Sequence, residues 1–223
     1  MADLYSILDW PASTGLDILA VARGLVGSRP HGPGAKVLQL RCKAVDTCTR
    51  IGLVHQVAPL ARAADVRFVV NDDITAALAC PGLADGVHLG QDDLVALGGA
   101  AGLRALRERA PAGFAIGIST HDLAQVRASA DLPIDYIGFG PILPTRSKHD
   151  PEPCVGMAGL AAACEVARHP VVAIGGLDAT SAVEAAERGA SMVAMIGALV
   201  APTSDAIAAR VTAIAAALAR VTR

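Results

Sequence analysis

The chain alternates short apolar runs with longer Ala- and Leu-rich stretches from one end to the other, and this alternation constrains its fold more than any single motif. The apolar runs lack the polar alternation of a half-exposed strand, which is typical of parallel strands buried on both faces. The stretches between them, from residues 16–26 to residues 206–219, have helical patterns. The predicted strands are LYSIL from Leu4, VLQLR from Val37, RFVVN from Arg67, DGVHL from Asp85, FAIGIS from Phe114, DYIGFG from Asp135, VVAIGG from Val171 and MVAMIG from Met192.

Eight β/α units are the number that closes a parallel sheet into a (β/α)8 TIM barrel. An open, doubly wound α/β sheet is the alternative, but no predicted strand is followed by the G-x-G-x-x-G turn that nucleotide-binding sheets of that kind carry. No Gly/Ser-rich linker divides the chain. We therefore predict an α/β fold of the TIM-barrel type, formed by one domain over residues 1–223.

Composition narrows the possible partners. The net charge of −2 leaves no basic excess to neutralise the phosphates of a nucleic acid. No apolar run approaches the roughly 20 residues that span a bilayer, and the N-terminus lacks the pattern of a signal peptide. The five cysteines form no C-x-x-C pair and are interpreted as reduced thiols. We expect a cytoplasmic protein with small-molecule partners, no nucleic acid and no membrane; a homo-oligomer is left open.

In a TIM barrel the chemistry lies at the carboxyl ends of the strands, and polar residues follow the predicted strands here. Arg41 and Lys43 stand two residues apart at the end of the second strand, so both side chains should leave the same face and bind a polyanion. A solvated strand end is the alternative. The chain has sixteen arginines and three lysines, so a retained lysine indicates a need for a compact ammonium group.

Acidic residues follow the third and fourth predicted strands. Asn71, Asp72 and Asp73 end one strand, and HLGQDD from His88 ends the next. Carboxylates beside cations are typical of a Mg²⁺ site, where one or two carboxylates share the ion with substrate phosphates. A helix N-cap is the alternative for a single aspartate, and Asp73 and Asp92 compete for that role.

Other strand ends carry hydroxyls and glycines. GIST brings Ser119 to the end of the fifth strand, where a helix cap is the alternative to a ligand contact. The glycines that end the seventh and eighth strands free backbone N–H groups for an anion, in the usual phosphate position of this barrel. A proline-rich loop over residues 140–156 follows the sixth strand, and we predict that Lys148 reaches the first anion site from it while Thr145 and Ser147 reach the second.

The motifs QLRCK, NDD, GVHLGQDD, GIST, GFGPILPTRSK and AIGGL occur in this order across nearly the whole chain, and together they resemble the thiamine phosphate synthases. The resemblance implies a (β/α)8 barrel that couples hydroxymethylpyrimidine diphosphate to thiazole phosphate, giving thiamine phosphate and pyrophosphate. It also implies a dissociative reaction assisted by Mg²⁺, in which a pyrimidine methyl cation is captured by the thiazole nitrogen.

The resemblance further assigns residues to roles. It implies that the pyrimidine diphosphate is held by Gln39, Arg41, Lys43, Asn71, Ser119 and Lys148, of which Arg41, Lys43, Ser119 and Lys148 are the predicted catalytic residues. It implies Asp72 and Asp93 as ligands of Mg²⁺, and Thr145 and Ser147 for the thiazole phosphate, with backbone groups of Gly176, Ile196 and Gly197.

This chain departs from the family pattern at two positions. Cys42 stands where the family usually has Glu, and Gly197 where it often has Ser. Strand alternation predicts that Cys42 points away from Arg41 and Lys43. The alternatives in function are a thiazole tautomerase, which resembles this barrel and uses a histidine at a position like His121, a non-catalytic ligand-binding barrel, and an unrelated phosphate-binding isomerase. The aspartates and the paired cations favour the synthase.

Overall fold

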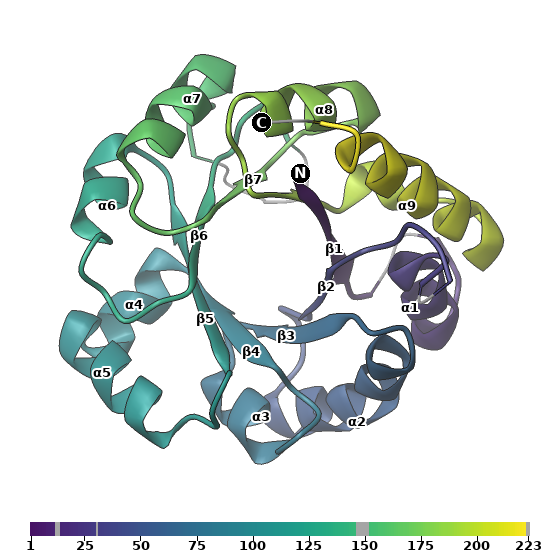
Figure 1. Ribbon diagram of the computed structural model, residues 1–223. Coiled ribbons are helices and arrows are strands. Elements are labelled where there is room, and N and C mark those ends of the chain that lie inside the picture. Colours follow the sequence, from purple (N-terminus) through teal and green to yellow (C-terminus); the bar gives the residue numbers. More distant parts are fainter. Residues whose placement is uncertain (12–13, 30, 146–151, 222–223) are drawn as a thin grey trace.

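The strands form a closed parallel barrel in chain order, with the helices arranged around it (Figure 1). The computed structural model describes residues 1–11, 14–29, 31–145 and 152–221. β1 pairs with both β2 and β8, which closes the sheet. The (β/α)8 TIM barrel predicted from the sequence is therefore confirmed. The strands are β1 Asp3–Asp9, β2 Val37–Arg41, β3 Arg67–Asn71, β4 Gly86–Leu89, β5 Ala115–Thr120, β6 Tyr136–Phe139, β7 Val171–Ile174 and β8 Met192–Met195.

The helices follow the strands and cover the outside of the barrel (Figure 1). The connection between β4 and β5 carries two of them, separated by Gly98; Gly98 and Gly99, the first residue of the second helix, both have positive φ. None of the helices in the described ranges has the length and hydropathy to cross a membrane. They are α1 Ile18–Val26, α2 Thr47–Ala63, α3 Ile74–Ala79, α4 Gln91–Leu97, α5 Gly99–Arg109, α6 Leu123–Ala128, α7 Gly156–Val166, α8 Ala179–Glu187, α9 Ser204–Leu218 and the 3₁₀ helix Gly197–Leu199.

Each strand buries both of its faces, which explains the continuous apolar runs. On β1, Leu4 and Leu8 pack outward in the large core under the helices, whereas Tyr5 and Ile7 point into the barrel. The smaller inner cluster is formed by Tyr5, Ile7, Val37, Val69, Tyr136, Val172 and Ala194.

Aspartate side chains fix the starts of several helices. Asp17 accepts a hydrogen bond from the backbone N–H of Ala20 at 2.8 Å, so α1 begins at Ile18 and not at residue 16. An N-cap carboxylate satisfies a helix-end donor and complements the helix dipole. The same arrangement begins α2, α3, α6 and α8 at Asp46, Asp73, Asp122 and Asp178.

Candidate active site

A cavity of about 490 Å³ opens at the carboxyl ends of the strands. Polar side chains from several strands converge on it, as expected for the active face of a TIM barrel. Thr145, after β6, and glycines after β7 and β8 lie on the side opposite β2 and β3 in the strand order. The predicted site residues that line this cavity are Gln39, Arg41, Asn71, Ser119, Thr145, Gly176, Ile196 and Gly197.

The floor of the cavity is a line of hydrogen-bonded side chains from β1, β2, β4, β5 and β6. Gln39 donates from Nε2 to the hydroxyl of Tyr5 at 2.9 Å, and this hydroxyl lies 2.9 Å from that of Tyr136. The Tyr136 hydroxyl is 3.1 Å from Nδ1 of His88, whose Nε2 is 3.0 Å from Oγ of Ser119. The line joins two predicted ligand residues, Gln39 and Ser119, through three residues that were not predicted.

Burial keeps the two tyrosines of the floor neutral. It raises the pKa of Tyr5 and of Tyr136 well above the ordinary value, although the hydrogen bonds that Tyr5 receives oppose the shift. The floor therefore presents neutral hydroxyls and an aromatic surface at physiological pH. Strand alternation is the signal that could have identified these residues, since Tyr5 and Tyr136 face the barrel interior with Gln39.

Two glycines make room for the aromatic rings of the floor. A Cβ atom on Gly117 would lie 2.1 Å from Cζ of Tyr136, and one on Gly138 would lie 3.2 Å from Cε1 of His88. The His88 ring stacks on that of Tyr136, with 5.5 Å between the centroids. The position of both rings therefore depends on the absence of a side chain at Gly117 of β5 and at Gly138 of β6.

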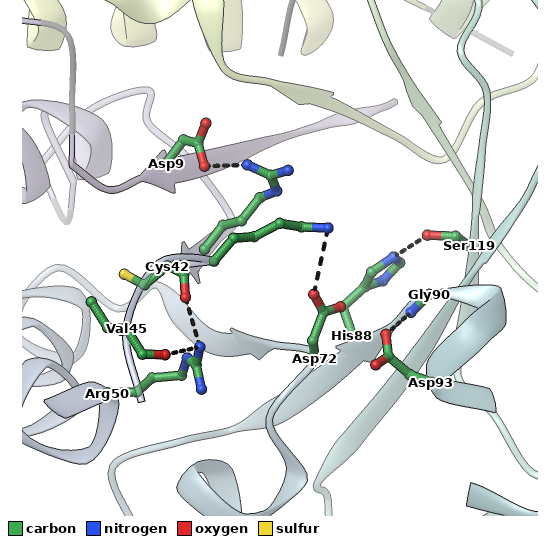
Figure 2. A network of polar contacts seen from close by, with 11 residues as sticks. Asp9, Cys42, Val45, Arg50, Asp72, His88, Gly90, Asp93 and Ser119 are labelled. Carbon is green, nitrogen blue, oxygen red and sulfur yellow. Dashed lines mark hydrogen bonds and ion pairs between the residues drawn. The ribbon is translucent and has the colours of Figure 1, made fainter. Parts of the chain in front are cut away.

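Two cations lie at the carboxyl end of β2, and each is associated with a carboxylate (Figure 2). Arg41 forms an ion pair with Asp9, which stands opposite it in the register of β1 and β2. Lys43 extends into solvent with 60% of its side chain exposed, and its Nζ lies 4.0 Å from Oδ2 of Asp72. Sequence reasoning missed Asp9, because nothing in the spacing along the chain indicates that it pairs with Arg41.

The carboxylates of Asp72 and Asp93 lie together beside the cavity (Figure 2). Burial raises the pKa of Asp72 to about 6, and the charge of Asp93 and a hydrogen bond between the two carboxyl groups add to the shift, whereas Lys43 and Arg41 oppose it. Asp93 also accepts a hydrogen bond from the backbone N–H of Gly90 at 2.8 Å. Two carboxylates held this close favour a cation between them.

The cap alternative is confirmed for Asp73 and wrong for Asp92. Asp73 caps α3 by accepting a hydrogen bond from the backbone N–H of Ala76 at 2.8 Å, and it also pairs with Arg50. Burial would raise the pKa of Asp73, but these contacts outweigh it and the pKa is lowered. At α4 the N-cap is Gly90. The backbone N–H of Gly90 donates to the side chain of Asp93, which stands three residues after it in the chain, and not to Asp92. Asp92 is exposed.

The glycine loop after β7 is packed against the connection after β6. Leu143 donates its backbone N–H to the carbonyl of Gly175 at 3.0 Å. Gly176 has φ +69°, and a Cβ there would lie 2.5 Å from the carbonyl oxygen of Pro144, so only glycine fits. Thr145 follows directly in the chain. Ser147 and Lys148, predicted as ligands from the same loop, lie outside the described residues.

Cys42 faces away from the site, as strand alternation predicts. It is 2% exposed and belongs to the outer core, whereas Arg41 lines the cavity. Burial raises the pKa of its thiol to about 11, although Arg50 opposes the shift. The thiol is therefore a protonated core group, and it does not take the place of a carboxylate at the site.

The closed barrel and the cavity on which polar side chains converge at the carboxyl ends of its strands define a (β/α)8-barrel enzyme. The family of thiamine monophosphate synthases matches residues 13–199 of the chain. Thiamine-phosphate synthase of Pelotomaculum thermopropionicum is 35% identical over 219 residues, which are 98% of this chain and 93% of that protein. That of Methanocella arvoryzae is 36% identical over 208 residues, covering 93% of this chain and 92% of the relative.

A solved structure agrees with these relatives. Thiamine phosphate pyrophosphorylase from Pyrococcus furiosus superposes with a TM-score of 0.77 at 27% identity, covering 97% of this chain and 95% of that one. The chain belongs to the thiamine monophosphate synthase family.

Proposed function

We propose that the chain couples hydroxymethylpyrimidine diphosphate to thiazole phosphate, releasing thiamine phosphate and pyrophosphate. The observation that carries the proposal is that residues suited to binding anions lie on two sides of one cavity. Arg41 and Asn71 line one side, with Lys43 beside them; Thr145 and the glycine loops line the other. Two phosphorylated substrates that meet above a common floor fit this division.

Each substrate has a distinct place in the proposal. The pyrimidine ring lies over the floor formed by Gln39, Tyr5 and Tyr136, where neutral donors and acceptors meet its nitrogens. The diphosphate extends toward the cations. The thiazole phosphate is held by Thr145 and by backbone groups at Gly176, Ile196 and Gly197. The family resemblance adds Ser147 on this side and Lys148 on the diphosphate side.

The carboxylates of Asp72 and Asp93 fit Mg²⁺. Mg²⁺ takes one or two protein carboxylates and completes its ligands with phosphate oxygens and water. Among the described residues no three His, Cys, Asp or Glu side chains gather in a way that could hold a metal, so this pair would need ligands from the diphosphate. When bound, the ion would neutralise charge on the departing pyrophosphate.

The proposed chemistry breaks the bond between the pyrimidine methylene carbon and the diphosphate oxygen. The electron pair leaves with pyrophosphate, and the thiazole nitrogen donates its lone pair to the resulting methyl cation to form the C–N bond. No proton transfer is required, which is consistent with a floor of neutral tyrosines. Arg41 and Lys43 stabilise the charge that develops on the leaving group, an electrostatic contribution that is usually large.

The other candidate functions fit the site less well. His121 lines the cavity and its Nδ1 lies 2.6 Å from the carbonyl of Gly140, so a proton-transferring tautomerase has a candidate group. Such a reaction, or ligand binding alone, gives no role to the adjacent carboxylates of Asp72 and Asp93. A phosphate-binding isomerase would use the glycine loops but not these acids.

The proposal is tested by measuring pyrophosphate release with both substrates present. We expect release that requires the thiazole phosphate and that falls to background when Mg²⁺ is chelated and recovers when it is restored. Reactions lacking one substrate serve as controls. Mg²⁺-independent turnover would remove the metal from the proposal, and binding of both substrates without pyrophosphate release would leave the non-catalytic barrel as the function.

Gly197→Ser tests the thiazole-phosphate side. A Cβ at Gly197 meets no atom within 4 Å, so the side chain fits, and its hydroxyl can donate to the phosphate. We expect the KM for thiazole phosphate to fall by about 2- to 10-fold, the effect of one hydrogen bond, with the KM for the pyrimidine diphosphate unchanged. Gly197→Ala fills the same space without a donor and should leave both values unchanged. Equal effects of Ser and Ala would argue against a phosphate at this position.

A further inference from the structure

One buried side chain fixes the backbone on which Lys43 stands. Nη2 of Arg50, from α2, donates to the carbonyl oxygens of Cys42 and Val45 at 2.6 and 3.0 Å. These carbonyls lie on either side of Lys43 in the chain. The guanidinium group therefore closes the turn that presents the lysine (Figure 2).

The same guanidinium group is anchored to the next connection of the barrel. Nη1 of Arg50 pairs with Asp73, and the two side chains are only 11% and 9% exposed. Asp73 is itself fixed, because it caps α3 through the N–H of Ala76. The turn that carries Lys43 is thus tied through Arg50 to the start of a helix.

The contacts of the Lys43 side chain are much weaker. It is 60% exposed, and its 4.0 Å approach to Asp72 is the kind of surface ion pair that contributes little to holding a side chain in place. Arg50 also leaves its Nε buried and without a hydrogen-bond partner among the described residues, which lowers stability.

We infer that Arg50 is a positioning residue for Lys43 and, through it, for the diphosphate. The inference rests on the proposed function, which places the diphosphate beside Lys43. Arg50 is suited to this role because its planar guanidinium group donates to two carbonyls and a carboxylate at once, whereas a lysine ammonium group at this position would reach fewer of them.

A double-mutant cycle tests the inference with inorganic pyrophosphate and Mg²⁺ as the probe. Calorimetric affinities are compared for the wild type, Arg50→Lys, Lys43→Ala and the double variant. We expect Arg50→Lys to weaken pyrophosphate binding about tenfold in the wild-type background and less than twofold in the Lys43→Ala background, because residues that are coupled through one backbone turn do not act additively. Arg62→Lys, an exposed change on the same helix, is the matched control and should leave the affinity unchanged.

The possible failures are distinguishable. A wild type that does not bind pyrophosphate would overturn the proposed function and the inference with it. If the wild type binds, an Arg50→Lys loss that is absent, or equally large with and without Lys43, overturns the inference alone. If Arg50→Lys does not fold, Arg50→Met combined with Asp73→Asn removes the buried charge pair and keeps a cap for α3; the same dependence on Lys43 is expected.

Discussion

Asp72→Asn is expected to lower kcat by about 100- to 1000-fold, the usual effect of removing one electrostatic group from a reacting centre. The variant loses one of the two carboxylates proposed to hold Mg²⁺ while keeping the shape of the side chain. Asparagine also tolerates the left-handed backbone of this position, where φ is +64°. Asp93→Asn should behave alike, since its amide oxygen can still accept from the N–H of Gly90.

The same change is expected to stabilise the metal-free protein. The pKa of Asp72 is raised from 3.8 to about 6, so the folded state favours the protonated acid and loses stability as pH rises through 6. A shift of this size corresponds to roughly 3 kcal/mol. Asp72→Asn removes this penalty, so the Tm at pH 8 should increase by about 6–12 °C, with little difference from the wild type below pH 4.

Two measurements decide this prediction. Thermal unfolding with a chelator at pH 4 and pH 8 gives the stability, and pyrophosphate release with saturating Mg²⁺ gives kcat. Asp92→Asn, an exposed neighbour on α4, is the matched control and should change neither value. A variant with full activity, or one that is less stable at pH 8, would contradict the close carboxylate pair as the source of both effects.

Lys43→Ala and Arg41→Ala are expected to weaken binding of the pyrimidine diphosphate about 10- to 100-fold, as loss of a charged hydrogen bond does. Both side chains are assigned to the diphosphate side, so the affinity for thiazole phosphate should stay within about twofold. Separate titrations of the two substrates measure this difference. Equal losses for both would show that the cavity is not divided into two anion-binding sides.

The control for these variants lies at the other end of the same strand. Lys36 immediately precedes β2, whereas Arg41 ends it, so Lys36→Ala removes an exposed lysine at the amino end of the barrel. It should leave both affinities unchanged. A comparable loss from Lys36→Ala would indicate that overall charge, and not the site, attracts the diphosphate.

The fold was predictable because the apolar runs and the helical patterns between them both agree with a barrel. β2 and β3 have the bounds that their apolar runs predict, since Arg41 and Asn71 end both the runs and the strands. β7 is shorter than its predicted run, because Gly175 and Gly176 have positive φ and leave the strand. The hydrophobic pattern does not reveal this change in backbone conformation, which is needed to bring the loop against the connection after β6.

The site was predictable only in part. The rule that polar residues follow the strands identified Arg41 and Asn71, and the family resemblance added Gln39; all three line the cavity. Neither identified Tyr136, which occurs inside an apolar run, or Arg50, whose contacts are made from a helix. Side-chain contacts between different helices and strands depend on closure of the barrel, and they cannot be inferred from one sequence.

The glycines beneath the floor indicate how such a site could change its ligand during evolution. Gly117 and Gly138 have no side chains with which to bind a ligand, yet they decide where the rings of Tyr136 and His88 lie. Any larger residue at position 117 would displace the tyrosine ring and alter the depth of the cavity. A new ligand shape is thus accessible through a single mutation on a strand, with every charged and hydrogen-bonding residue of the barrel left as it is.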